Sequence, residues 1–136
     1  MKYEYINDLT SDIGYTAYGS TLKELFENAA EALFSIISKI EKVKVKQKIT
    51  VRVKAENYED LLYNWLQELI ALVDTEELFL CRFNIVSISD KSLTAECEGE
   101  SISPELGNTL VKAVTNYKFK IETEEKIKRA TVTLDI

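Results

Sequence analysis

Residues 129–136 read R-A-T-V-T-L-D-I and predict a β-strand that continues to the last residue of the sequence. Apolar residues at 130, 132, 134 and 136 alternate with polar residues at 129, 131, 133 and 135, which is the period of a strand with one buried face. The side chain of Asp135 and the terminal carboxylate of Ile136 are therefore expected side by side, on an element that packing holds in place.

The rest of the chain predicts more strands of this kind, joined by short polar turns. Such turns favour antiparallel pairing between consecutive strands. The predicted strands, including the last one, cover residues 2–6, 14–19, 48–55, 78–88, 92–101, 110–121 and 127–136.

Two amphipathic helices interrupt this series of strands. The first, predicted over residues 21–39, begins with Thr21 and Glu24 in the spacing of a capping box, and the second, over residues 58–73, follows Asn57 as its cap. Each helix has one apolar face, so each is expected to lie on a sheet. We predict an α+β fold: a two-layer sandwich in which two helices pack on one face of a mostly antiparallel β-sheet.

The composition is that of one globular domain over residues 1–136, with 46% hydrophobic residues. Seventeen basic residues against 23 acidic ones leave a net charge of −6 and a pI near 4.8. The surface as a whole should therefore repel the phosphates of RNA, and a basic protein is the better electrostatic partner.

The sequence offers little support for enzymatic chemistry. Histidine is absent, which removes the commonest general base and the commonest zinc ligand. No spacing joins a nucleophile to a base, and the four glycines are too scattered to form a phosphate-binding loop. We therefore predict neither catalytic residues nor residues that bind an organic cofactor.

The cysteines and the hydropathy indicate where in the cell the protein is expected. Cys81 and Cys97 have neither metal-binding nor redox spacing, so we interpret them as buried thiols in a reducing environment. No signal peptide opens the sequence, and no apolar run reaches the length of a membrane span. We expect a soluble, cytoplasmic protein with no membrane partner.

Asp12, in T-S-D-I-G (10–14), is the best candidate for a third carboxylate near Asp135 and Ile136. Three such groups repel each other by about 3 kcal/mol per pair at ~5 Å and an effective dielectric of about 20. A hard divalent cation such as calcium, magnesium or manganese would relieve this repulsion. The alternative for Asp12 is an ordinary turn residue.

A second acidic run, D-T-E-E at residues 74–77, follows the second helix. One interpretation is a solvated end to the helix. The other is a functional cluster, because negative charge at the C-terminal end of a helix is unfavourable and so favours a role for these residues.

Several segments taken together resemble the archease family of small tRNA-splicing cofactors. They keep the order and spacing of the family over nearly the whole chain, although each is weak alone. The segments are D-L-T-S-D-I-G (8–14), A-Y-G (17–19) running into T-L (21–22), F-E-N-A-A (26–30), N-W-L-Q-E-L (64–69), D-T-E (74–76) with R-F (82–83), K-A-V-T (112–115) and L-D-I (134–136).

The resemblance implies a protein without enzymatic activity that stimulates the GTP-dependent RNA ligase of tRNA splicing. It would promote guanylylation and multiple turnover of the ligase, which is then the protein partner, and it would meet tRNA only indirectly. The resemblance also implies a divalent cation, commonly calcium. The family ligands match Asp12, Asp135 and Ile136, the trio that the carboxylate argument also selects.

Three positions depart from the family. Leu9 stands where the family has histidine, and Asn116 and Tyr117 stand where it has tyrosine and histidine, so no histidine-dependent step is carried over.

Two other functions stay open at the level of sequence. One is a chaperone or specificity factor for a tRNA-modifying methyltransferase. The other is a metal-dependent phosphoesterase that would use water bound at Asp12 and Asp135.

Overall fold

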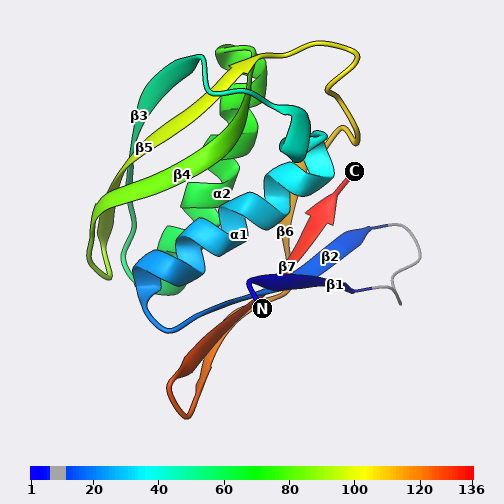
Figure 1. The fold of residues 1–136 in the computed structure, drawn as a ribbon. Helices are drawn as coiled ribbons and strands as arrows, with labels where there is room; N and C mark the ends of the chain where they lie inside the picture. Colours follow the sequence, from blue (N-terminus) through cyan, green and yellow to red (C-terminus); the bar gives the residue numbers. More distant parts are fainter. Residues whose placement is uncertain (7–11) are drawn as a thin grey trace.

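In the computed structural model, which describes residues 1–6 and 12–136, the chain forms seven strands, two α-helices and one short 3-10 helix (Figure 1). All of the predicted strands and both predicted helices are present. In chain order the elements are β1 (Tyr3–Ile6), β2 (Ile13–Gly19), α1 (Leu22–Ile37), η1 (Ile40–Lys42), β3 (Gln47–Lys54), α2 (Tyr58–Thr75), β4 (Leu78–Ile88), β5 (Ser92–Ser101), β6 (Ala113–Glu124) and β7 (Ile127–Asp135).

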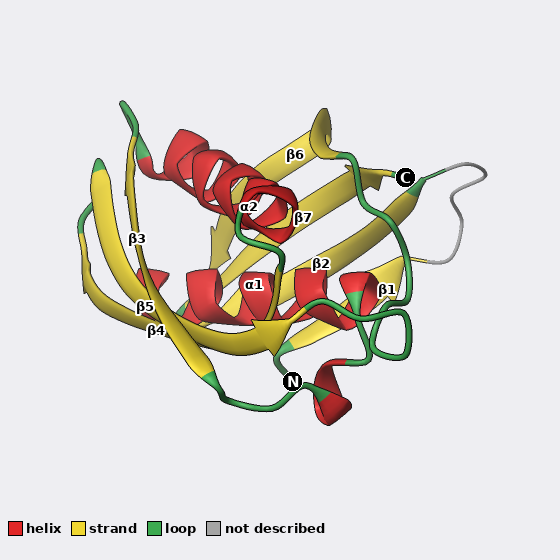
Figure 2. Ribbon diagram, turned by 90° about the horizontal axis from the view of Figure 1, so that it is seen from above, coloured by secondary structure: helices red, strands yellow, loops and turns green. Residues whose placement is uncertain are grey.

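The strands form two sheets in the described part of the chain, and every neighbouring pair is antiparallel. One sheet has the order β1-β2-β7-β6 and the other the order β3-β5-β4. Figure 2 shows α1 and α2 between the two sheets, and each helix contacts strands of both. The α+β class, the two helices and the antiparallel pairing are confirmed, while the strands divide between two sheets instead of one.

The helices explain this division, because both are apolar around much of their circumference. Nine residues of α1 are buried, at every turn of the helix and on more than one side. Burying them requires cover from two directions, and a helix that is apolar on most sides is enclosed rather than laid on a surface. The second sheet provides the additional cover.

The helix caps follow the sequence closely at the start of each helix. Thr21 Oγ1 accepts a hydrogen bond of 3.1 Å from the Glu24 N–H, and Asn57 Oδ1 accepts one of 2.8 Å from the Asp60 N–H. The first helix ends at Ile37, earlier than expected, because Ser38 leaves the helical conformation.

Two aromatic side chains tie α1 into the core through their polar atoms. Trp65 Nε1 donates to the carbonyl oxygen of Phe26 and the Tyr15 hydroxyl donates to that of Ala29, each at 3.0 Å. Both side chains are fully buried. The core therefore buries large rings without leaving their donors unpaired.

Gly19 allows the last residue of β2 to approach α1. A Cβ at this position would lie 2.4 Å from the Leu25 nitrogen, a backbone atom that cannot move aside. Only glycine permits the approach that holds the first sheet against the helix.

Candidate functional site

Asp12 directly precedes β2, and Asp135 is the last residue of β7. The antiparallel register pairs Ile13 with Leu134. Asp12 directly precedes Ile13 and Asp135 directly follows Leu134, so the two aspartates flank the same end of this paired ladder. Leu134 is fully buried, so Asp135 faces the other side of the sheet. Asp12 is half-buried and Asp135 is exposed.

The start of β6 holds Asp135 from the opposite side. Ala113 pairs with Asp135, and the Lys112 N–H donates a hydrogen bond of 2.8 Å to the carbonyl oxygen of Asp135. Ile136 follows and is 38% exposed. In Figure 1 this end of β7 lies beside the start of β2. Asp135 is therefore part of an internal strand of the sheet and not of a loose tail.

One face of α2 sets the position of β6. Gln67 Oε1 accepts a hydrogen bond of 2.6 Å from the Val114 N–H, the Tyr63 hydroxyl donates one of 3.0 Å to the Val114 carbonyl oxygen, and Glu59 Oε2 accepts one of 3.0 Å from the Ile121 N–H. The three side chains recur every four residues, so they share one helix face. They satisfy backbone groups of β6, which is an edge strand of its sheet in the described part of the chain.

The donor set at this end of the sheet suits a hard cation. Within residues 1–6 and 12–136, no three histidine, cysteine, aspartate or glutamate side chains converge closely enough to hold a metal ion. Asp12 and Asp135 supply two side-chain carboxylates, and the third oxygen group would be the carboxylate of Ile136. An all-oxygen set fits calcium, magnesium or manganese and does not fit metals that prefer sulfur or imidazole.

The positions that depart from the family pattern fall in two places. Leu9 lies outside the described residues. Asn116 and Tyr117 lie in β6 where the pairing with β7 shifts register, between Thr115 and Lys120. Tyr117 is 55% exposed, and its N–H donates to Thr115 Oγ1 at 3.2 Å. These two residues therefore occupy an irregular, accessible part of β6.

Sequence reasoning missed a cavity of about 420 Å³ at the C-terminal ends of α1 and α2, which residues 102–111 close on one side. Residues 103–108 fall in one of the polar turns expected between the predicted strands at 92–101 and 110–121. The signal that could have revealed a wall is the apolar content of this segment: Ile102, Leu106, Leu110 and Val111 are more apolar than a solvated turn requires.

Both cysteines carry free thiols, with Cys97 buried and Cys81 half-buried. Among the described residues, neither helix combines the length and the apolar character needed to cross a membrane.

Fold and site together define a class: small α+β proteins in which two antiparallel sheets enclose two helices, with acidic residues at a shared strand end. The family model that matches residues 3–136 is the archease protein family (MTH1598/TM1083). The chain belongs to the archease family.

Similar proteins cover the whole chain. It is 37% identical over 140 residues to a protein archease of Sulfurisphaera tokodaii, across 100% of this chain and 99% of that one. It is 35% identical to a protein archease of Archaeoglobus fulgidus, with 100% of both chains covered.

Solved structures show the same fold. The solution structure of Methanobacterium thermoautotrophicum protein 1598 superposes with a TM-score of 0.82 at 34% identity, covering 98% of both chains. A crystal structure from Thermotoga maritima, described as an archease and possible chaperone, superposes with a TM-score of 0.70 at 18% identity, covering 96% of this chain and 95% of that one.

Proposed function

We propose that this protein is a non-enzymatic activator of the GTP-dependent RNA ligase of tRNA splicing, acting in the cytoplasm. It promotes guanylylation of the ligase and its return for further turnovers, and it meets tRNA only through the ligase. Family membership supports this proposal, and the observation that carries it is the pairing of Ile13 with Leu134, which puts Asp12 and Asp135 at the same end of the β2–β7 ladder.

Three groups of the chain would hold a divalent cation, with calcium as the first candidate and magnesium or manganese as alternatives. They are the Asp12 and Asp135 side chains and the carboxylate of Ile136. The cation supplies positive charge that cancels the repulsion among these carboxylates. The protein contributes position: the hydrogen bond from the Lys112 N–H and the pairing with Ala113 of β6 hold the backbone of Asp135.

In this mechanism the protein presents a fixed charged surface to the ligase. The start of β2 and the end of β7 are held together, so the adjoining surface keeps one shape when the ligase meets it. A rigid surface binds with less ordering cost than a mobile one. The ligase supplies the nucleotide chemistry, and the activator favours the ligase conformation that accepts GTP.

The test follows guanylylation of the cognate ligase with labelled GTP, and ligation with RNA in excess. Wild type should stimulate both steps, while Asp12→Asn and Asp135→Asn should reduce stimulation by about tenfold or more. Asp90→Asn is the matched control, because Asp90 is an exposed residue of the β4–β5 turn. No stimulation by wild type would refute the activator function. Full stimulation by Asp12→Asn would remove the carboxylate site from the mechanism.

A further inference from the structure

We propose that the cavity at the C-terminal ends of α1 and α2 is a docking site for a segment of the ligase that carries a bulky apolar side chain beside lysine or arginine residues. This inference rests on the proposed function, because it names the surface through which the activator holds its partner. The cavity of about 420 Å³ falls within the size range of ligand-binding pockets.

The walls of the cavity are apolar and come from several elements. Its floor is formed by side chains that are at most 7% exposed, and its margin by two that are much more exposed, Ile102 at 40% and Leu110 at 75%. An accessible apolar margin around a buried apolar floor is the usual anatomy of an anchor pocket. The floor residues are Ile37, Ile70, Phe79 and Val111.

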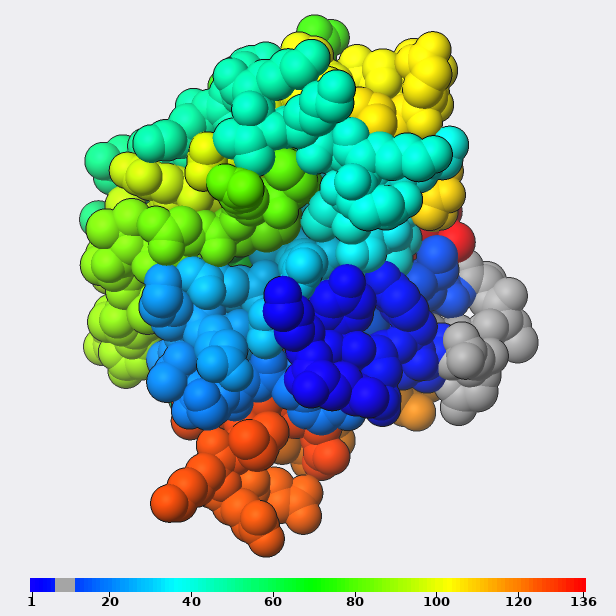
Figure 3. Space-filling view, in the orientation of Figure 1, coloured from blue at the N-terminus to red at the C-terminus, as the bar shows by residue number. Residues whose placement is uncertain are grey.

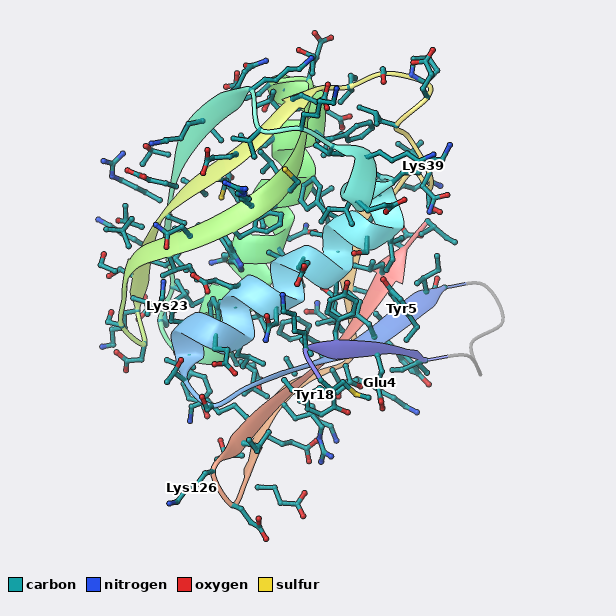
Figure 4. The ribbon with its side chains drawn as sticks, viewed as in Figure 1. Glu4, Tyr5, Tyr18, Lys23, Lys39 and Lys126 are labelled. Carbon is teal, nitrogen blue, oxygen red and sulfur yellow. The ribbon has the colours of Figure 1, made fainter. Side chains whose placement is uncertain are left out.

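Hydrogen bonds hold the closing segment, residues 102–111, in place. The N–H groups of Asn108 and Thr109 donate to the last carbonyl oxygens of α1, at Ile37 and Ile36, at 3.0 and 3.1 Å. These carbonyls have no partner within the helix, so the segment caps it. Lys39, labelled in Figure 4 at the end of α1, donates its N–H to Leu106 at 2.8 Å. The cavity is therefore preformed, and occupying it requires little ordering.

Acidic residues at and beside the cavity, called here the acidic rim, indicate the chemistry of the occupant. Asp74 lines the cavity, and Glu76 and Glu77 follow at the end of α2, where the helix dipole is also negative. Among residues 1–6 and 12–136, none of the ion pairs includes these three carboxylates. Positive side chains of a partner would supply the missing charge, whereas RNA phosphates would be repelled.

The backbone of Glu77 links the acidic end of α2 to the closing segment, residues 102–111. Its φ is 53°, in the left-handed region that non-glycine residues seldom occupy, and its carbonyl oxygen accepts a hydrogen bond of 2.9 Å from the Ile102 N–H. Glutamate at this position places a carboxylate in a backbone conformation that glycine would adopt with less strain.

The cavity adjoins the carboxylate site. Val111 lines the cavity, and the next residue, Lys112, donates to Asp135. In Figure 3 the gold part of the surface, near residue 110, lies beside the cyan surface and close to the red C-terminal residue. One face of a protein partner can therefore contact both places, and a segment of the ligase fits this arrangement better than a free small molecule.

Two variants test the cavity. Gly107→Val fills it, because a Cβ at Gly107 would lie 3.7 Å from Phe79 Cζ and 3.6 Å from the Ser103 carbonyl oxygen, both ordinary contacts. The triple variant Asp74→Asn/Glu76→Gln/Glu77→Gln removes the acidic rim. Controls are Val86→Leu, at an exposed position of β4, and Glu56→Gln/Asp90→Asn/Glu125→Gln, which changes the charge equally at exposed positions elsewhere.

Binding to the ligase is measured by calorimetry, with thermal unfolding and sedimentation alongside. We expect each test variant to weaken binding by about tenfold or more, which is about 1.4 kcal/mol, while both controls bind like wild type. Gly107→Val should unfold as a single transition and keep its response to calcium, and added salt should weaken wild type more than the triple variant.

Three outcomes would overturn the inference. Wild-type affinity in both test variants, with stimulation of the ligase intact, refutes the cavity and leaves the proposed function standing. A wild-type protein that neither binds nor stimulates the ligase refutes both. A wild-type dimer that Gly107→Val dissociates would make a second copy of this chain the occupant.

Discussion

At the scale of single residues, Tyr15 shows how the core makes stability depend on pH. Its phenol is fully buried, and burial raises its pKa far above the ordinary value of 10.0, because the anion would lose its hydration. An unfolded chain releases this proton above about pH 10, while the folded chain keeps it. The free energy of unfolding contributed by Tyr15 is therefore fully present below that pH and declines above it.

Tyr15→Phe separates the contribution of the Tyr15 hydrogen bond from the contribution of its raised pKa. At pH 7 the variant should lose about 1 kcal/mol, because the hydrogen bond to Ala29 is removed. Between about pH 9.5 and 11 its stability should fall less steeply than that of wild type. Urea unfolding at both ends of this range measures the slopes, and identical slopes would contradict the assignment.

The two thiols should differ in reactivity. Burial raises the pKa of Cys97 to about 12, and burial also raises the pKa of Cys81, which is only half-buried. Since the thiolate is the reactive form, alkylation at pH 8 should modify Cys81 well before Cys97. Cys97 should react only when the protein unfolds, so low concentrations of urea should accelerate it. Mass spectrometry follows both sites, and equal rates in the native protein would refute this prediction.

At the scale of elements, a strained and charged residue at the end of α2, Glu77, lowers the free energy of unfolding. Glu77→Gly should raise the free energy of unfolding by about 1 kcal/mol, since glycine adopts a φ of 53° without strain and removes a carboxylate from the helix end. The same change should weaken binding to the ligase. Glu125→Gly, at the other end of the molecule with a φ of 58°, is the control that should stabilise without this loss.

The contact between α2 and β6 should influence the cation site. Gln67→Met removes the acceptor of the Val114 N–H and should cost about 1–3 kcal/mol, because a partly buried donor is left without a partner. It should also reduce the stabilisation that calcium provides, because β6 positions Asp135. Glu68→Met, one residue further along and exposed, is the control. Thermal unfolding with and without calcium measures both effects.

At the scale of the whole molecule, the cation should join the residue before β2 to the end of β7. Calcium at about 100 times its Kd adds about 2.7 kcal/mol to the folded state. For a chain of 136 residues this raises Tm by roughly 9 °C. Asp135→Asn should lose this gain, yet be slightly more stable than wild type in a chelator, since one repelling carboxylate is gone. Asp90→Asn should behave like wild type, and a Tm insensitive to calcium would refute the site.

Much of the secondary structure could be predicted from the sequence, because it depends on neighbours along the chain. The alternation of residues 129–136 predicted β7, and Thr21 and Asn57 predicted the helix starts. The start of β6 was misplaced at residue 110 instead of Ala113, since Leu110 lies at the margin of a cavity and not in a sheet. Strand periodicity cannot distinguish these two surroundings.

By itself, the sequence determined the elements, the α+β class, the acidic balance and the candidate carboxylates, because spacing and composition are local or additive properties. Only the tertiary structure decided that the strands form two sheets, that the start of β2 pairs with the end of β7, and that the ends of α1 and α2 enclose a cavity with an acidic rim. The physical reason is that each of these features joins residues far apart in the chain. Their meeting depends on which apolar faces must be covered together, and no single segment carries that information.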